Sequence, residues 1–278
     1  MKEKSIKIKT PISYYGGKQQ LVDVILKMIP GHQIYCEPFF GGGAVFFKKK
    51  PSYLEVINDI NDNLMNFYVQ CQKNFDKLAA EIQNTLCSEF QYKKAYSIYR
   101  GDITVDDVTK AVAAWIVFNS SFMNSAKGSW KWDNGSDGSH IGVVLSNARQ
   151  NFCPWIKKRL QYVQISCRDA LLVIRQRDSC STFFYLDPPY PGSKQGHYAG
   201  YTMEDFKLLL QTLESIQGLF LLSCYELPIL HEYAEKKNWQ LKRIEMRKRC
   251  VSKWRVESKV ECLLSNYMPS TYVQTELF

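Results

Sequence analysis

Apolar residues along the chain recur with two different spacings, and the alternation of these spacings predicts an α/β fold. Short apolar runs between turn residues are typical of buried strands, and apolar residues three or four apart are typical of helices. The strand-like runs cover residues 33–36, 54–57, 163–166, 183–186 and 218–223. Helical spacing lies between them, so the first and last parts of the chain have the strand, turn and helix layout of a doubly wound sheet.

Capping residues and alternating patterns define the last third of the chain. Thr202 followed by Asp205 predicts a helix N-cap, and Gly218 is the expected end of that helix. Beyond it, apolar and polar residues alternate at 240–249 and 255–266. Two such runs predict a β-hairpin at a sheet edge.

The middle of the chain has a different pattern of apolar residues and a different composition. Helical spacing runs through 62–82 and returns at 105–118, and residues 119–140 are rich in Ser, Gly, Asn and Trp. A stretch of helix and loop that interrupts the α/β alternation is typical of an inserted domain. The expected organisation is a first part, an insert and a second part, at 1–61, 62–160 and 161–278.

Composition and charge favour a polyanionic partner. The chain has 278 residues, which suffice for one large domain or one domain with an insert. Its formal net charge is +9, and 14% of its residues are aromatic, so both cations and stacking rings are available. No run approaches the roughly 18 apolar residues of a membrane span, and the lysine-rich start at 1–9 does not suit a signal peptide.

The nine cysteines favour a reducing compartment. None forms a Cys-x-x-Cys pair, and no His/Cys spacing indicates a zinc site. Most of them lie in apolar runs, which suggests reduced thiols in the core. We therefore expect a soluble cytoplasmic protein with no metal and no membrane contact.

A proline corner follows the apolar run at 183–186. Its residues are Asp187, Pro188, Pro189 and Tyr190. The two prolines stop the strand and leave no backbone N–H between the acid and the ring. Hydrogen-bond acceptors beside a flat ring suit a planar base that bears an exocyclic amine. A plain strand-ending proline turn is the alternative interpretation.

A glycine-rich turn joins the first predicted strand to a helix. Gly41 and Gly43 would let a ligand approach the backbone closely. Phe46 stands where a dinucleotide fingerprint has its third glycine, and no Gly-Lys-Ser/Thr follows, so the loop suits a nucleoside without a pyrophosphate. Asp59, at the end of the next strand, suits a ribose. The alternative is a glycine turn with a capping acid.

A second glycine turn lies near the start of the chain, between Tyr14 and Lys18. An aromatic ring, two glycines and a lysine suit a clamp on a carboxylate or phosphate. An ordinary turn with a solvated lysine explains the same residues.

Taken in order, these motifs resemble those of the Dam-like DNA adenine-N6 methyltransferases. The resemblance rests on residues 14–18, 37–43, 59 and 187–190, and the run at 260–267 is similar to the family's last strand. It spans about residues 10 to 267. It implies S-adenosylmethionine as cofactor and a Rossmann-like fold with a mixed seven-stranded sheet, into which a mainly helical target-recognition domain is inserted.

The resemblance also implies roles for single residues. The catalytic residues would be Asp187, Pro188, Pro189 and Tyr190. The cofactor-binding residues would be Tyr14, Lys18, Glu37, Phe39, Phe40, Gly41, Gly43, Asp59, Asp169 and Asp187. Where this chain has Tyr14 the family more often has tryptophan, and Asp169 suits a helix N-cap equally well.

Two segments are candidates for contact with DNA. In 119–140, asparagines suit adenine edges and cations suit phosphates; a flexible surface loop with two buried tryptophans is the alternative. The tip of the predicted hairpin carries a run of cations, a pattern that is usually a solvated face. The expected DNA-binding residues are Asn119, Asn124, Lys127, Trp130, Lys131, Arg247, Lys248, Arg249 and Lys253.

The corner suggests how the reaction would work. The N6 amine of adenine is a poor nucleophile because its lone pair is delocalised into the ring. Asp187 and the Pro188 carbonyl would each accept one N6–H bond and turn the lone pair toward a sulfonium methyl. Tyr190 would stack on the base, which must first be flipped out of the duplex.

We therefore expect a monomeric, site-specific adenine-N6 methyltransferase that acts on double-stranded DNA in a bacterial or phage-infected cell. It would serve a restriction system beside a cognate endonuclease, a phage, or an orphan regulatory function. Methylation of cytosine N4 or of adenine in RNA needs the same amine chemistry and is one rival. A non-catalytic DNA-binding relative is the other.

Overall fold

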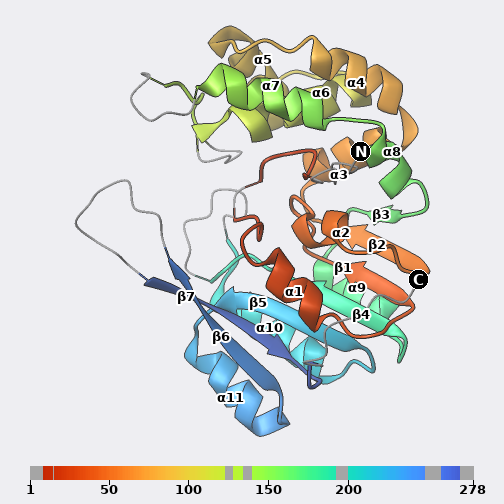
Figure 1. The fold of residues 1–278 in the computed structure, drawn as a ribbon, viewed down its shortest axis with the longest axis vertical. Helices are drawn as coiled ribbons and strands as arrows, with labels where there is room; N and C mark the ends of the chain where they lie inside the picture. Colours follow the sequence, from red (N-terminus) through yellow and green to blue (C-terminus); the bar gives the residue numbers. More distant parts are fainter. Residues whose placement is uncertain are drawn as a thin grey trace, which may run out of the picture. The chain divides into compact units, whose positions relative to one another are not determined.

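The computed structural model describes residues 9–14, 16–122, 128–133, 140–191, 200–247 and 258–269. The chain divides into two compact units, which are described separately below (Figure 1). Unit 1 is made of residues 1–23, 40–51 and 58–167, and unit 2 of residues 24–39, 52–57 and 168–278. The domain boundaries expected at 61 and 160 stay a prediction.

A mixed seven-stranded sheet forms the framework, as the resemblance to the Dam-like family implies. Its strand order is β3-β2-β1-β4-β5-β7-β6. Strand β1 pairs in parallel with β2 and β4, and β4 pairs in parallel with β5, whereas β7 is antiparallel to both β5 and β6. The strands are β1 (Ile34–Glu37), β2 (Leu54–Asn58), β3 (Gln164–Ser166), β4 (Thr182–Leu186), β5 (Leu219–Tyr225), β6 (Gln240–Arg247) and β7 (Ser258–Ser265).

The neighbouring strands β1 and β4 mark the point where the order of the sheet reverses. From β1 the chain proceeds to β2 and β3 on one side, and from β4 it proceeds to β5 on the other. In open α/β sheets ligands bind outside the carboxyl ends of the strands at such a switch point. The β1–β4 pair is therefore the first place to look for a site.

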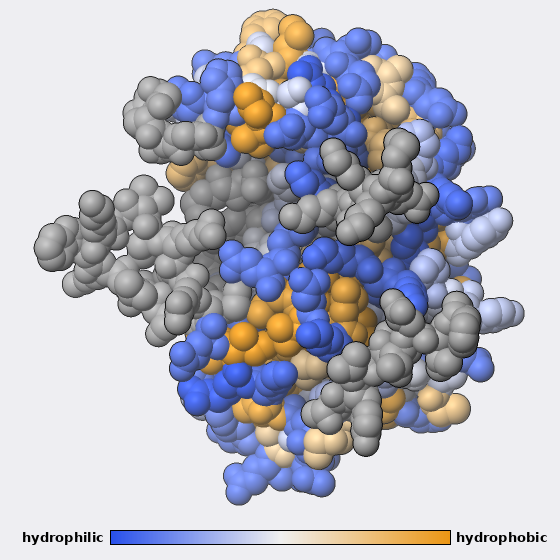
Figure 2. Space-filling model, in the orientation of Figure 1, coloured by the Kyte–Doolittle hydropathy of each residue, from blue (hydrophilic) through white to orange (hydrophobic). Residues whose placement is uncertain are grey.

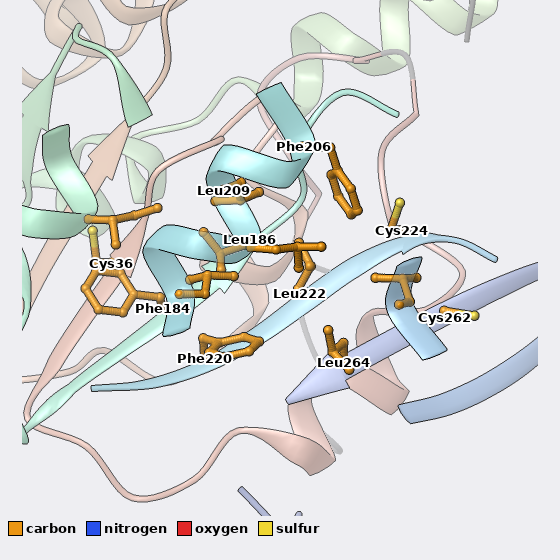
Figure 3. Close-up of a cluster of buried hydrophobic side chains, with 14 of the residues drawn as sticks. Cys36, Phe184, Leu186, Phe206, Leu209, Phe220, Leu222, Cys224, Cys262 and Leu264 are labelled. Carbon is orange, nitrogen blue, oxygen red and sulfur yellow. The ribbon is translucent and has the colours of Figure 1, made fainter. Parts of the chain in front are cut away.

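The core of unit 2 lies between one face of the sheet and three helices, α9 (Ala170–Arg177), α10 (Met203–Glu214) and α11 (Pro228–Lys237). Phe206 and Leu209 of α10 point toward Phe184, Leu186 and Leu222 of the strands (Figure 3). All five side chains are fully buried. The strands were predictable because a strand buried on both faces leaves a continuous apolar run.

Helices dominate unit 1. They are α2 (Ala44–Lys48), α3 (Asp62–Lys73), α4 (Phe75–Gln83), α5 (Glu89–Arg100), α6 (Asp107–Ser120), α7 (Ile141–Asn151) and α8 (Trp155–Leu160). Helix α6 is buried along most of its length, and its Trp115 donates a hydrogen bond to the carbonyl of Pro11 (3.1 Å). Segment 62–160 is therefore mainly helical, as expected. Helix α1 (Val22–Met28) passes from unit 1 into unit 2.

Two expectations about helices need correction. The pattern at 62–82 forms two helices rather than one, because Asn74 caps both and its side chain donates to Gln70 (2.6 Å). Helix α10 ends at Glu214, not at Gly218. Gly218 instead lies in the bend just before β5, where a Cβ would lie 2.8 Å from the Thr182 carbonyl oxygen.

Thiols and surface residues complete the description. Cys36, Cys71, Cys224 and Cys262 are buried, but Cys87, Cys167 and Cys180 are exposed, so the expectation of core thiols holds for only part of the set. The face of the molecule in Figure 2 is mostly hydrophilic, with scattered hydrophobic groups. Within the described ranges, no helix has the length and apolar character that a membrane span requires.

Candidate active site

The strand register of unit 2 brings several predicted site residues to one edge of the sheet. Cys36 pairs with Phe184 across β1 and β4, and Glu37 pairs with Ile57 across β1 and β2. These strands run parallel, so their carboxyl ends meet at the same edge. Glu37 and Asp187 are therefore neighbours at the carboxyl ends of β1 and β4.

The proline corner leaves β4 as a rigid and mostly buried turn. Pro188, Pro189 and Tyr190 are buried, whereas Asp187 is only half-buried. The Tyr190 ring packs edge-on against Tyr225 of β5, with a distance of 4.0 Å between the ring centroids. The corner therefore has a fixed aromatic wall and one carboxylate that keeps some access.

A buried carboxylate that the sequence reasoning missed lies behind the corner. Glu261 of β7 is only 4% exposed. Its Oε1 accepts hydrogen bonds from the hydroxyl of Tyr190 and from Ser223 Oγ (3.0 Å). The same Tyr190 hydroxyl lies 3.3 Å from Asp187 Oδ1. An acid inside an otherwise apolar strand was the available signal, because a buried charge needs partners.

Buried tyrosine hydroxyls line this edge, and they stay protonated. Burial, followed by the charges of Asp187 and Glu261, raises the pKa of Tyr190. Burial, followed by the charge of Asp187, also raises the pKa of Tyr185. On β1, the Tyr35 hydroxyl donates to Glu37 Oε2 at 2.9 Å. A neutral phenol is a hydrogen-bond donor, so each of these hydroxyls can donate a hydrogen bond to a carboxylate.

The glycine loop belongs to unit 1 and has the backbone conformation that only glycine adopts readily. Gly41 has φ 49° and Gly43 has φ 64°. A Cβ at Gly43 would lie 2.5 Å from the Phe40 ring, so the loop is closed tightly over that buried side chain. Tyr14 covers the outside of the loop, since a Cβ at Gly42 would lie 2.9 Å from Tyr14 Cβ.

Asp59 fixes this loop from the end of β2. Its carboxylate accepts from the backbone N–H of Gly41 (2.9 Å) and of Asn61 (3.0 Å). Asp59 is only 1% exposed. The interpretation as a glycine turn with a capping acid is therefore correct as a description of structure, and it is compatible with a ligand because a carboxylate accepts about four hydrogen bonds.

Other predicted residues have local structural roles. The Lys18 carbonyl accepts from the N–H of Leu21 and of Val22 at the start of α1. Asp169 is exposed and caps α9, accepting from the Leu172 N–H (3.1 Å). The N-cap interpretation of Asp169 is thus confirmed, and its contact with a cofactor stays a prediction.

The candidate DNA segment is described only in part. Asn119 is buried, where its side chain accepts from the Ser13 N–H (3.1 Å) and donates to the Trp115 carbonyl (2.9 Å). A base contact by Asn119 stays a prediction, and one that these bonds count against. Trp130 is half-buried and pairs with Ser121 in a short antiparallel bridge.

Trp132 is 68% exposed, so the alternative of two buried tryptophans does not hold. Lys131 is half-buried and its N–H donates to the Ser120 carbonyl (2.8 Å). Arg247 ends β6. The other expected DNA-binding residues lie outside the described residues: Asn124, Lys127, Lys248, Arg249 and Lys253.

Metal chemistry has no visible site in the described part of the chain. No group of three or more His, Cys, Asp and Glu residues is placed there to hold a metal ion.

A sheet with this order, a glycine loop after β1, an acid after β2 and a proline corner after β4 define a Rossmann-like methyltransferase. The model of the family described as D12 class N6 adenine-specific DNA methyltransferase matches residues 14–213. The chain belongs to this family of enzymes, and S-adenosylmethionine is accordingly its cofactor.

Relatives of known name support this assignment. The type II methyltransferase M.MjaIII of Methanocaldococcus jannaschii is 29% identical over 226 residues, which cover 72% of this chain and 76% of the relative. The DNA adenine methylase of Salmonella typhi is 23% identical, with 93% of this chain and 95% of the relative covered. The DNA adenine methylase of Escherichia coli K12 is 22% identical, with the same coverage.

Proposed function

We propose that this enzyme transfers a methyl group from S-adenosylmethionine to N6 of an adenine flipped out of double-stranded DNA at a specific sequence. The observation that carries the proposal is the corner at Asp187, which directly follows β4 at the switch point of the sheet. It combines a half-buried carboxylate with a fixed aromatic ring at the edge where such sheets bind ligands.

The corner would act by accepting hydrogen bonds. Asp187 and the Pro188 carbonyl would each accept one hydrogen of the adenine amine, which turns the nitrogen lone pair out of the ring plane. Both acceptors are held before the reaction, so they stabilise the positive charge that develops on nitrogen without reorganisation. The proposed reaction needs no covalent intermediate on the protein.

The residues present fit the cofactor. Gly41 and Gly43 give the loop a left-handed backbone that glycine adopts readily, and Asp59 would accept from the ribose hydroxyls. Glu37, Phe39, Phe40, Tyr14 and Lys18 would complete the cofactor contacts. When bound, S-adenosylmethionine supplies an electrophilic methyl group on a sulfonium.

DNA binding would draw on charge as well as on the recognition segment. Flipping a base costs a few kcal/mol, which contacts to the DNA backbone must offset. The net charge of +9 supports such contacts. The proposed contact residues are Asn119, Asn124, Lys127, Trp130, Lys131, Arg247, Lys248, Arg249 and Lys253.

The decisive experiment is expression in a host that has no DNA methylation. Genomic DNA would be digested and its nucleosides measured by mass spectrometry, and the methylated positions would be sequenced. We expect N6-methyladenine in one short sequence context. Accumulation of N4-methylcytosine alone, or of N6-methyladenine in RNA alone, would reject the proposed acceptor. The sequence context would also show whether a partner endonuclease with the same target is to be sought.

Replacement of the corner carboxylate tests the mechanism. Asp187→Ala should slow methylation by about 100-fold or more, the effect of removing one fixed transition-state partner, while S-adenosylmethionine binding in calorimetry persists. Glu232→Ala, an exposed acid on α11 in the same unit, is the matched control and should methylate normally. Equal rates for the two variants would reject the role of Asp187.

A further inference from the structure

Residues 10–14, the N-terminal strap, are attached to helix α6 by two hydrogen bonds. The Nε1–H of Trp115 donates to the Pro11 carbonyl, and the backbone N–H of Ser13 donates to Asn119 Oδ1, each over 3.1 Å. The strap and α6 both belong to unit 1. The position of the strap therefore depends on a helix within segment 62–160, far away in the sequence.

The strap ends at Tyr14, whose side chain touches both α6 and the glycine loop. Its ring packs against that of Phe118 in α6, with 5.3 Å between the ring centroids. A Cβ at Gly41 would lie 3.1 Å from Tyr14 Cδ1, so the ring also lies against the backbone of the loop. Phe118 is fully buried and has little room to move. A displacement of the strap would therefore change how Tyr14 covers the loop.

Asn119 is a costly residue at its place near the end of α6. Asparagine is a weaker helix former than alanine, and a buried amide costs free energy unless it is hydrogen-bonded. Asn119 is 4% exposed. Its Nδ2 donates to the Trp115 carbonyl (2.9 Å), and its Oδ1 accepts from the Ser13 N–H. A carbonyl can only accept and an N–H can only donate, so these two partners fix the amide with its acceptor toward the strap.

We propose that Asn119 is a positioning residue for the cofactor site, because by holding Ser13 it keeps Tyr14 packed against the glycine loop that would bind S-adenosylmethionine. This inference rests on the proposed function, which places Tyr14 and the loop at the cofactor. Asn119 is also the first residue of the candidate DNA segment 119–140. The helix that leads into that segment therefore contributes to cofactor binding without touching the cofactor.

Loss of this acceptor should weaken cofactor binding in the absence of DNA. Asn119→Ala removes the bond to Ser13, and the dissociation constant for S-adenosylmethionine in calorimetry should rise about 3- to 10-fold, the effect of one net hydrogen bond. Because no DNA is present, a base contact by Asn119 cannot contribute to this change. Asn119→Asp keeps an acceptor for the Ser13 N–H and should have an affinity nearer to that of the wild type.

Asn66→Ala is the matched control at the opposite end of α6. Asn66 of α3 donates to the carbonyl of Asp107, the first residue of α6 (2.8 Å), and accepts from Gln70 Nε2 (3.1 Å), so its replacement also removes two side-chain hydrogen bonds. Asn66→Ala should bind S-adenosylmethionine with wild-type affinity, whatever stability it loses in urea denaturation. Should Asn119→Ala not fold, Trp115→Phe makes the same test, because it keeps a ring and removes the other hydrogen bond to the strap.

Tyr14→Ala separates failure of this inference from failure of the proposed function. It should weaken binding of S-adenosylmethionine at least as much as Asn119→Ala does. If Tyr14→Ala weakens binding while Asn119→Ala binds as tightly as the wild type, the inference is overturned and the proposed cofactor site stands. Equal losses of affinity in Asn119→Ala and Asn66→Ala would also overturn it, because a general loosening of α6 would then explain both. Wild-type affinity in Tyr14→Ala would instead reject the cofactor contact that the proposed function gives to Tyr14, and the inference with it.

Discussion

Gly43 offers a direct test of how tightly the glycine loop is built. Its φ of 64° lies in the left-handed region, and an added Cβ would lie 2.5 Å from Cζ of Phe40. Phe40 cannot move aside easily, because it is 3% exposed and packs edge-on against Tyr68 at 4.8 Å between centroids. Gly43→Ala should therefore destabilise unit 1 in two ways.

Each contribution has an expected size. The left-handed conformation costs about 1–2 kcal/mol for a residue with a Cβ. Forcing one extra carbon into a packed core costs about 1–3 kcal/mol. The free energy of unfolding should therefore fall by roughly 2–5 kcal/mol in Gly43→Ala.

Gly101→Ala is the matched control. Gly101 also belongs to unit 1 and has φ 85°, but a Cβ there would meet no atom within 4 Å. It carries the conformational cost alone, and the effect of alanine on the unfolded chain is the same in both variants. The difference between the two variants should therefore be about 1–3 kcal/mol, the packing contribution.

Urea denaturation followed by circular dichroism measures this difference, and calorimetry measures the affinity for S-adenosylmethionine. We expect Gly43→Ala to be the less stable variant and to bind the cofactor more weakly, while Gly101→Ala binds it normally. Equal stability of the two variants would refute the packing argument. If a folded Gly43→Ala variant bound S-adenosylmethionine with unchanged affinity, the glycine loop would not be part of the cofactor site.

Three further predictions concern residues with local roles. Asp169→Ala removes the N-cap of α9 and should lower the free energy of unfolding by about 1 kcal/mol. Calorimetry with S-adenosylmethionine then tests whether Asp169 also contacts the cofactor, because loss of a cap alone leaves the affinity for the cofactor unchanged. Asn119→Ala removes the acceptor of the half-buried Ser13 N–H and one donor to the Trp115 carbonyl. It should cost about 1–3 kcal/mol in urea denaturation, a larger effect than at an exposed DNA-contacting residue. Hydrogen bonds from the Thr202 N–H and hydroxyl lower the pKa of Asp205. The capping box of α10 therefore stabilises the folded protein at neutral pH. This stabilisation is lost as the pH falls through the folded-state pKa of Asp205, which lies below 3.8. Thr202→Ala keeps the backbone N–H and removes the hydroxyl, so it should flatten part of that acid limb in thermal denaturation; an unchanged pH profile would contradict the contribution of the hydroxyl.

The sequence predicted the strands and strand ends well because their signals are local. All five residues of β4 are buried, which is what a continuous apolar run indicates. Asp59 and Asp187 were found because parallel strands present their carboxyl ends at one edge. The capping box at Thr202 and Asp205 was readable for the same reason, since its two residues are three apart.

Other features depend on contacts that local patterns do not contain. Helix α5 buries only Tyr92, Ala95 and Ile98, so its helical spacing is faint, although Ser88 three residues before Gln91 was a usable capping signal. The Tyr190–Glu261 contact joins residues 71 apart in the sequence. It arises only because β7 inserts next to β5, a pairing that no local rule specifies.

The carboxylates of the candidate site differ mainly in how deeply they are buried. Asp59 accepts from two backbone N–H groups, Glu37 from Tyr35, and Glu261 from Ser223 and Tyr190, and these three acids are almost fully buried. Burial of a charge is tolerated where such bonds compensate it, and the same bonds fix the neighbouring groups. Asp187 is the acid that stays half-buried, at the end of the strand beside the switch point. A group that must accept from a substrate needs that access, so its partial exposure favours Asp187 as the catalytic residue.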